Sequence, residues 1–145
     1  LGREGFTVIR EKIEAVAEKN PLVPREPADV TASPGDRYFE FHVLIDGKGR
    51  ALSEEDMVSL RGLSREFSAR LNAPVPLSYN VLKPSQRFLN MRARGVTFDE
   101  ALGPVNALQG RIAASGQLEV KKLICEYICF DTNRAVDNGW TEPLP

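Results

Sequence analysis

The order of strand-like and helix-like segments most strongly constrains how this 145-residue chain can fold. Residues 37–45 alternate apolar side chains with mixed ones, the period of two that is typical of a strand with one covered face. Two later segments instead carry apolar side chains at helical spacing, and each begins with a capping-box pair. The predicted elements are strand 37–45, helix 53–71, strand 75–82, strand 86–94, helix 97–115 and strand 118–130. This order predicts an α+β fold.

The sequence strand, helix, strand, strand, helix, strand is the split βαβ, or ferredoxin-like, pattern. It predicts a ferredoxin-like βαββαβ sandwich over residues 37–145, with a four-stranded antiparallel sheet, two helices on one face and a C-terminal loop tail. Residues 20–36 contain four prolines and are predicted to be an irregular, proline-rich linker. Residues 1–19 form a separate N-terminal segment. It begins like a strand but continues with strong helix formers, so an extra strand and a helix both stay open for it.

Charge and hydropathy narrow the classes of partner. The net charge is −1 and the isoelectric point about 5.9, whereas proteins that grip a phosphate backbone usually carry a strong positive excess. Nucleic-acid binding is therefore not expected. No apolar run approaches the roughly 20 residues that span a bilayer, and the first residues do not read as a signal peptide. These features predict a cytoplasmic protein that does not insert into a membrane.

Five segments of the chain resemble a family of uncharacterised bacterial proteins whose longer members have two ferredoxin-like halves in tandem. The segments are residues 6–14, 38–43, 78–80, 87–92 and 126–140, and the most specific is the ending Asp131-Thr-Asn133 followed by Asp137-Asn-Gly-Trp140. The resemblance implies that this chain comprises the end of a first half and the whole of a second half. Residues 6–15 would then be the last strand of the first half, and they could pair with the chain's own sheet or with another chain.

The period of two also sorts side chains onto the two faces of the predicted sheet. Phe39, Phe41 and Val43 are expected beneath the helices, while Tyr38 and the polar residues between them point to the open face. The polar side chains predicted on that open face are Glu40, His42, Ser78, Asn80, Asn90, Arg92 and Glu126.

These seven residues support more than one interpretation. Arg92 could bind a small anionic ligand through a bidentate contact, which favours a non-catalytic binding or protein-interaction module. Alternatively, His42, a glutamate and Arg92 could form the acid–base site of a small enzyme. Cross-strand ion pairs on an uncovered sheet would also be expected for stability alone. A homo-oligomer through the exposed sheet or the N-terminal segment is the expected assembly.

No metal site or cofactor is predicted. Cys125 and Cys129 lie four residues apart on one strand face, at about 13 Å, which is too far for a disulfide or a shared tetrahedral metal. They are expected to be reduced core residues. The chain has one histidine, which excludes a two-histidine site within one subunit. The segment Asp46-Gly-Lys-Gly-Arg50 places cations where a calcium loop needs oxygen ligands.

Overall fold

A computed structural model describes residues 5 and 7–136 of the chain, so the predicted tail ending with Asp137 and Trp140 lies mostly outside the described residues. The elements in chain order are β1 (Lys12–Val16), the 3₁₀ turn η1 (Ala17–Lys19), α1 (Pro27–Ala32), β2 (Tyr38–Asp46), α2 (Glu54–Leu71), β3 (Leu77–Tyr79), β4 (Arg87–Ala93), α3 (Phe98–Ala114) and β5 (Glu119–Asp131). The fold is α+β. In the part of the chain described, no helix is both long and apolar enough to cross a membrane.

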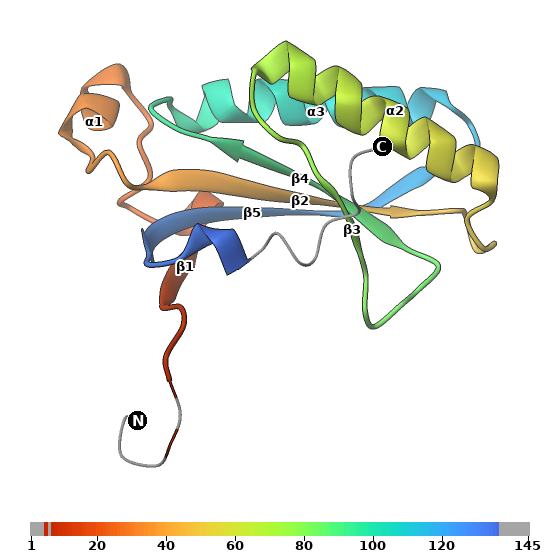
Figure 1. Ribbon diagram of the computed structural model, residues 1–145. Helices are drawn as coiled ribbons and strands as arrows, with labels where there is room; N and C mark the ends of the chain where they lie inside the picture. The colour runs from red at the N-terminus through yellow and green to blue at the C-terminus, as the bar shows by residue number, and fades with distance from the viewer. Residues whose placement is uncertain (1–4, 6, 137–145) are drawn as a thin grey trace.

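The five strands form one antiparallel sheet in the order β1-β5-β2-β4-β3. Helices α2 and α3 lie together over one face of this sheet, and α1 lies beyond one end of it (Figure 1). The opposite face carries none of the three helices. The central strand β2 pairs with both β4 and β5, so its side chains lie in the middle of each face.

The two faces of β2 are those predicted from the alternation. Phe39, Phe41 and Val43 are fully buried in the core, where Phe39 packs against Phe98 of α3 with ring centroids 5.6 Å apart. Both long helices begin with the expected capping boxes, in which Ser53 pairs with Asp56 and Thr97 with Glu100.

Within the N-terminal segment, the strand begins later than the resemblance implied, at Lys12. Lys12–Val16 pairs antiparallel with β5 at the edge of the sheet, so a helix there is wrong. Strong helix formers did not decide the outcome, because an unpaired strand edge on β5 offers backbone hydrogen bonds that a short isolated helix cannot match. A register shift follows Ile13, where the pairing passes over Cys129.

The proline-rich segment is not irregular throughout, because Pro27–Ala32 forms the short helix α1. Proline is favoured at the first helical position, and Glu26 and Asp29 form a reciprocal capping box around it. The strand predicted at 75–82 is also shorter than expected. Only Leu77–Tyr79 pairs with β4, since Pro76 has no N–H to donate and Asn80 turns the chain by accepting from the Leu82 N–H.

Both cysteines are unpaired thiols, as the spacing predicted. Cys125 belongs to the buried core, and half-buried Cys129 packs against it. Burial raises the pKa of the Cys125 thiol to about 12, so this thiol stays protonated and unreactive near neutral pH.

Candidate functional site

A connected set of polar side chains lies on the open face of the sheet, across four neighbouring strands. It contains every predicted site residue except Asn80, namely Glu40, His42, Ser78, Asn90, Arg92 and Glu126. The register explains why they meet. Glu40 lies opposite Arg92 on one side and Glu126 on the other, while His42 lies opposite Asn90. We call this set, together with Lys12, the open-face cluster.

The hydrogen bonds of Asn90 determine which ring nitrogen of His42 carries a proton. The Asn90 amide nitrogen donates to the Pro76 carbonyl at 3.3 Å and to Ser78 Oγ at 2.8 Å. A carbonyl only accepts, so the amide oxygen is the atom facing His42. Its distance to His42 Nδ1 is 2.6 Å. Nδ1 is therefore the protonated donor of the neutral ring, and the lone pair lies on Nε2.

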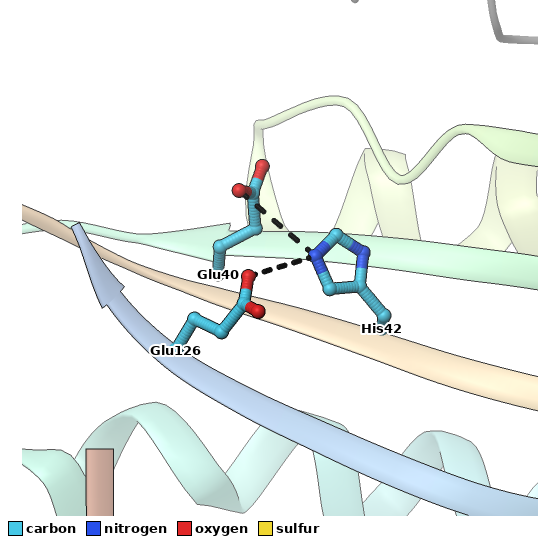
Figure 2. Close-up of side chains that lie close together, drawn as sticks. All are labelled: Glu40, His42 and Glu126. Atoms are coloured by element: carbon cyan, nitrogen blue, oxygen red, sulfur yellow. Dashed lines mark hydrogen bonds and ion pairs between the residues drawn. The ribbon is translucent and has the colours of Figure 1, made fainter. Parts of the chain in front are cut away.

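Two carboxylates face that Nε2 atom (Figure 2). Glu126 Oε2 lies 3.3 Å away and Glu40 Oε2 lies 4.0 Å away. A lone pair directed at carboxylate oxygens is unfavourable, whereas a second N–H there is favourable. Burial lowers the pKa of His42, but the hydrogen bonds to Glu126 and Asn90 and the charge of Glu40 outweigh it, so the pKa is raised. The site favours the imidazolium form.

Glu40 is a charged carboxylate at the centre of the cluster, with 3% of its side chain exposed. Arg92 donates to Oε1 at 2.7 Å, and Lys12 bonds Oε2. Burial raises the pKa of Glu40, but Lys12 and Arg92 more than offset this and the pKa is lowered. Both oxygens of Glu40 therefore hold fixed cationic partners.

Lys12 was not among the predicted site residues. It reaches the cluster from β1, and burial is outweighed by its bonds to Glu14 and Glu40, so its pKa is raised. No local motif marks it, because its partner lies 28 residues away and meets it only through the pairing of β1 with β5.

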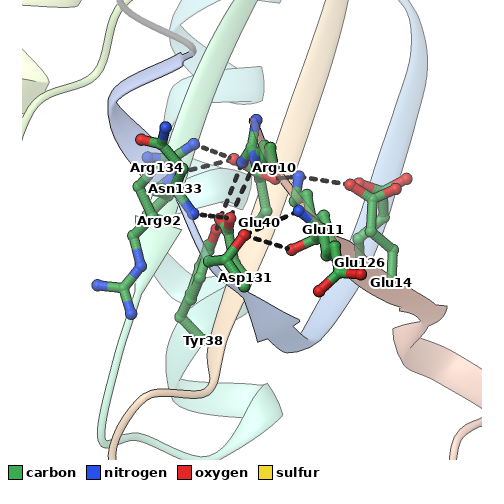
Figure 3. A network of polar contacts seen from close by, with 12 residues as sticks. Arg10, Glu11, Glu14, Tyr38, Glu40, Arg92, Glu126, Asp131, Asn133 and Arg134 are labelled. Carbon is green, nitrogen blue, oxygen red and sulfur yellow. Dashed lines mark hydrogen bonds and ion pairs between the residues drawn. The ribbon is translucent and has the colours of Figure 1, made fainter. Parts of the chain in front are cut away.

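A second polar network, centred on Asp131, joins β1 to the open face (Figure 3). Arg10 donates to both Asp131 oxygens, at 2.9 and 2.8 Å, and the Tyr38 hydroxyl donates to one of them at 2.7 Å. The Arg10 guanidinium outweighs burial and holds the pKa of Asp131 well below its usual range. Asp131 Oδ1 also accepts from the Asn133 N–H, which forms a local turn after β5.

Asn80 does not join the open-face cluster. Its amide nitrogen donates to Gln86 Oε1 at 2.9 Å, and Gln86 in turn donates to Asp46 at 3.0 Å. Since β3 ends at Tyr79, the alternation no longer applies to the next residue. Asn80 instead holds the turn between β3 and β4.

Three groups of the cluster could together contact a metal ion. The ligand atoms of Glu40, His42 and Glu126 all lie within 4.8 Å of one another. However, Lys12 and Arg92 already bond Glu40, and a protonated imidazole has no lone pair to give. The positive charges of Lys12 and Arg92 beside Glu40 oppose the binding of a metal cation. The arrangement therefore suits proton transfer and ion pairing better than metal binding.

The open-face cluster borders a hollow rather than a flat surface. A cavity of about 1110 Å³ is lined on the open face by Lys12, Glu40, His42, Phe88, Asn90, Arg92 and Ile124. The cavity extends past the part of β4 that does not pair with β3. On the helix side it is lined by apolar side chains that include Leu71, Val75 and Val105. We call this cavity the β4 hollow.

Comparisons with protein-family models, with curated proteins and with solved structures found no match to the chain.

Proposed function

We propose that the chain is a non-catalytic binding module of ferredoxin-like architecture, and that it binds a small molecule in the β4 hollow. The strand order β5-β2-β4-β3 and the placement of α2 and α3 on one face support the ferredoxin-like assignment. Strand β1 would be the last strand of a preceding half, as the resemblance to tandem ferredoxin-like proteins implies, and its pairing with β5 supports that assignment.

One observation carries the proposal. The hollow is lined at one end by charged and amide side chains whose positions are fixed by bonds to one another, and at the other by apolar side chains. Binding sites for small molecules are typically concave, largely apolar, and contain a few convergent polar groups. The lining therefore suits an organic molecule with an apolar body and a polar, anionic end directed towards Lys12 and Arg92.

Filling the hollow tests this proposal without breaking the ion pairs. Ile124 lines the hollow opposite His42, so Ile124→Trp should place an indole in it. The matched control is Leu44→Trp, because half-buried Leu44 lies on the same open face but does not line the hollow. We expect compounds that raise the Tm of the wild type to lose at least about tenfold in affinity in the first variant only. Equal loss in both variants, or unchanged binding in both, would refute the proposal.

A second candidate function is general acid–base catalysis by His42. The observation that favours it is the orientation of the ring, with Nδ1 fixed by Asn90 and Nε2 facing Glu126 at the border of the hollow. Because the facing carboxylates favour a proton on Nε2, the oriented ring would act first as a general acid, and as a base once that proton has been transferred. If bound compounds are converted, mass spectrometry should detect a product with the wild type and none with His42→Gln. Compounds recovered unchanged by the wild type would leave binding as the function.

We also propose that the chain forms a homodimer through β1. Among the described strands, β1 has a neighbour on one side only, and its Ile13 and Val16 are exposed by 59% and 61%. An exposed apolar edge strand is a template for pairing with another chain. In an antiparallel pair centred on Ile13, Lys12 of one copy would lie opposite Glu14 of the other, which makes the edge complementary in charge to a second copy of itself.

A further inference from the structure

Three arginine side chains converge on the ring of Tyr38. The guanidinium carbons of Arg94, Arg134 and Arg92 lie 4.4, 5.2 and 5.4 Å from the ring centroid. Arg92 lies in β4, Arg94 follows the end of β4, and Arg134 follows β5. Tyr38, whose ring they share, is the first residue of β2. We call these three residues the arginine triad.

Among residues 5 and 7–136, the triad has more positive charge than the neighbouring carboxylates neutralise. Arg92 pairs with Glu40, and Arg134 donates to the Asp36 carbonyl at 3.3 Å. Arg94 is exposed, and within the described residues it has no carboxylate partner. Burial is the largest cause that lowers the pKa of Arg94, and the nearby charges of Arg134 and Arg92 lower it further.

Tyr38 holds the triad together without neutralising it. Its side chain is almost fully buried, and its hydroxyl donates to Asp131, whose charge is already matched by Arg10. Burial raises the pKa of Tyr38 to about 12, so the phenol is neutral at any physiological pH. A neutral ring attracts guanidinium groups through its π face only. An anion would supply the missing negative charge.

A second cavity, of about 210 Å³, begins beside the triad. Arg94 of the triad and the Tyr38 ring line this cavity, together with Ser33, Arg37 and Gly95. Its remaining lining is largely apolar and includes Pro24, Val30 and Val96. A charged group at the triad could therefore be attached to a small organic body that lies in this cavity.

We infer that the arginine triad is a binding site for the phosphoryl group of a small phosphomonoester. A phosphoryl group carries nearly two negative charges at neutral pH and three terminal oxygens, enough to accept from several guanidinium groups at once. A single carboxylate has one charge and two oxygens, and would leave part of the triad unneutralised. Arg92 and Arg94 also line the β4 hollow, so the triad borders both cavities. Ile124, by contrast, lies opposite His42, four residues along β2 from Tyr38.

Calorimetric titration of the full chain with phenyl phosphate, and separately with inorganic phosphate, tests the inference. We expect saturable binding of both, with phenyl phosphate the tighter, and about tenfold or greater weakening in Arg94→Gln. Arg94→Lys keeps the charge but not the planar pair of donors, so its affinity should lie between those of the wild type and Arg94→Gln. The matched control is Arg70→Gln, which removes another exposed arginine that lies over an aromatic ring, that of Phe67.

Three outcomes would overturn the inference: no binding of either probe at millimolar concentration, equal weakening in Arg94→Gln and Arg70→Gln, or binding of single-stranded DNA alone. Circular dichroism of each variant shows whether the fold is kept, and Arg94→Lys provides a second variant if Arg94→Gln does not fold. Ile124→Trp separates this inference from the proposed function, because inorganic phosphate has no organic body that could meet the added indole. The variant should weaken compounds that fill the β4 hollow and leave the binding of inorganic phosphate unchanged.

Discussion

Glu40 shows at the scale of one residue why the open-face cluster is rigid. A carboxylate with 3% exposure would lose most of its hydration, which costs several kcal/mol unless cations replace the water. Lys12 and Arg92 replace it from the two sides, and His42 lies 4.0 Å away. Because each charge fixes its neighbours, the side chains that line the hollow are held in place before any ligand arrives.

Removing one of these cations should destabilise the protein much more than breaking a surface pair. Arg92→Met leaves Glu40 partly uncompensated, so we expect a loss of about 2–3 kcal/mol in the free energy of unfolding, moderated because water reaches part of Arg92. Denaturant unfolding measures this. The control is Arg111→Met, because the pair of Arg111 with Glu66 is largely exposed. Its loss should lower the free energy of unfolding by less than about 0.5 kcal/mol. Similar losses in both variants would contradict a buried charge cluster.

His42 should make stability depend on pH above about 6.5, the usual pKa of the group. Its pKa is raised in the folded state by Glu126, Asn90 and Glu40 despite burial, so the folded protein binds the proton more tightly than the unfolded chain does. This contribution is complete below the unfolded pKa and is lost as pH rises through the folded one. Unfolding free energy should fall over that range.

The chain's one histidine makes this directly measurable. His42→Gln should flatten the decline in unfolding free energy above pH 6.5, and NMR titration of the wild-type imidazole should give a pKa above the ordinary value. An imidazole that titrates below 6.5 would contradict the assigned tautomer and the facing carboxylates.

At the scale of elements, the ion pair between Arg10 and Asp131 anchors the chain just before β1, next to the Lys12–Glu40 pair at the start of the strand. Asp131 has a fully buried side chain and Arg10 is 15% exposed, and their two hydrogen bonds tie the chain before β1 to the end of β5. The strand itself is short, so this pair is a large part of what holds it on the sheet.

Asp131→Asn should therefore loosen β1 selectively. An amide accepts less strongly from Arg10, and we expect the amide hydrogens of residues 12–16 to exchange about tenfold faster or more, while those of β2 keep their protection. Hydrogen exchange followed by mass spectrometry or NMR checks this. Asp56→Asn is the control, since Asp56 is also paired bidentately with an arginine but at the start of α2. If β1 exchanges equally in both variants, the ion pair does not hold the strand.

The exposed edge of β1 predicts concentration-dependent dimerisation. Placing lysines at Ile13 and Val16 should prevent two edges from pairing while changing monomer stability little, because both side chains are already exposed. Sedimentation velocity should show a dimer for the wild type and a monomer for the double variant. Val58→Lys, on exposed α2, should leave the dimer intact. A wild type that stays monomeric at high concentration would rule this interface out.

For the whole molecule, the alternation in residues 37–45 was sufficient to predict which face of the sheet is polar. Phe39 and Phe41 lie in the core, and Glu40 and His42 lie on the opposite face, as expected from a period of two. The helix boundaries followed from local capping residues. Such features are local in sequence, which is why one sequence is enough to find them.

What the sequence did not reveal depends on contacts between distant segments. Lys12 meets Glu40 and Arg10 meets Asp131 only because β1 adds to the edge beside β5, and the second pair is separated by 121 residues. Helix α1 was not predicted, because the prolines of residues 20–36 indicated an irregular segment. Pro27, at the first helical position, could have indicated the start of a helix. Asn80 was assigned to the open face because β3 was expected to continue past Tyr79.

An NMR screen of small anionic organic compounds against the isotope-labelled full chain tests most directly whether the open face binds ligands. Compounds that bind should shift the resonances of the His42 imidazole together with the amides of Phe88 and Asn90. These shifts should vanish in Ile124→Trp but persist in Leu44→Trp. Hits that map elsewhere and leave the His42 resonances unmoved would contradict it.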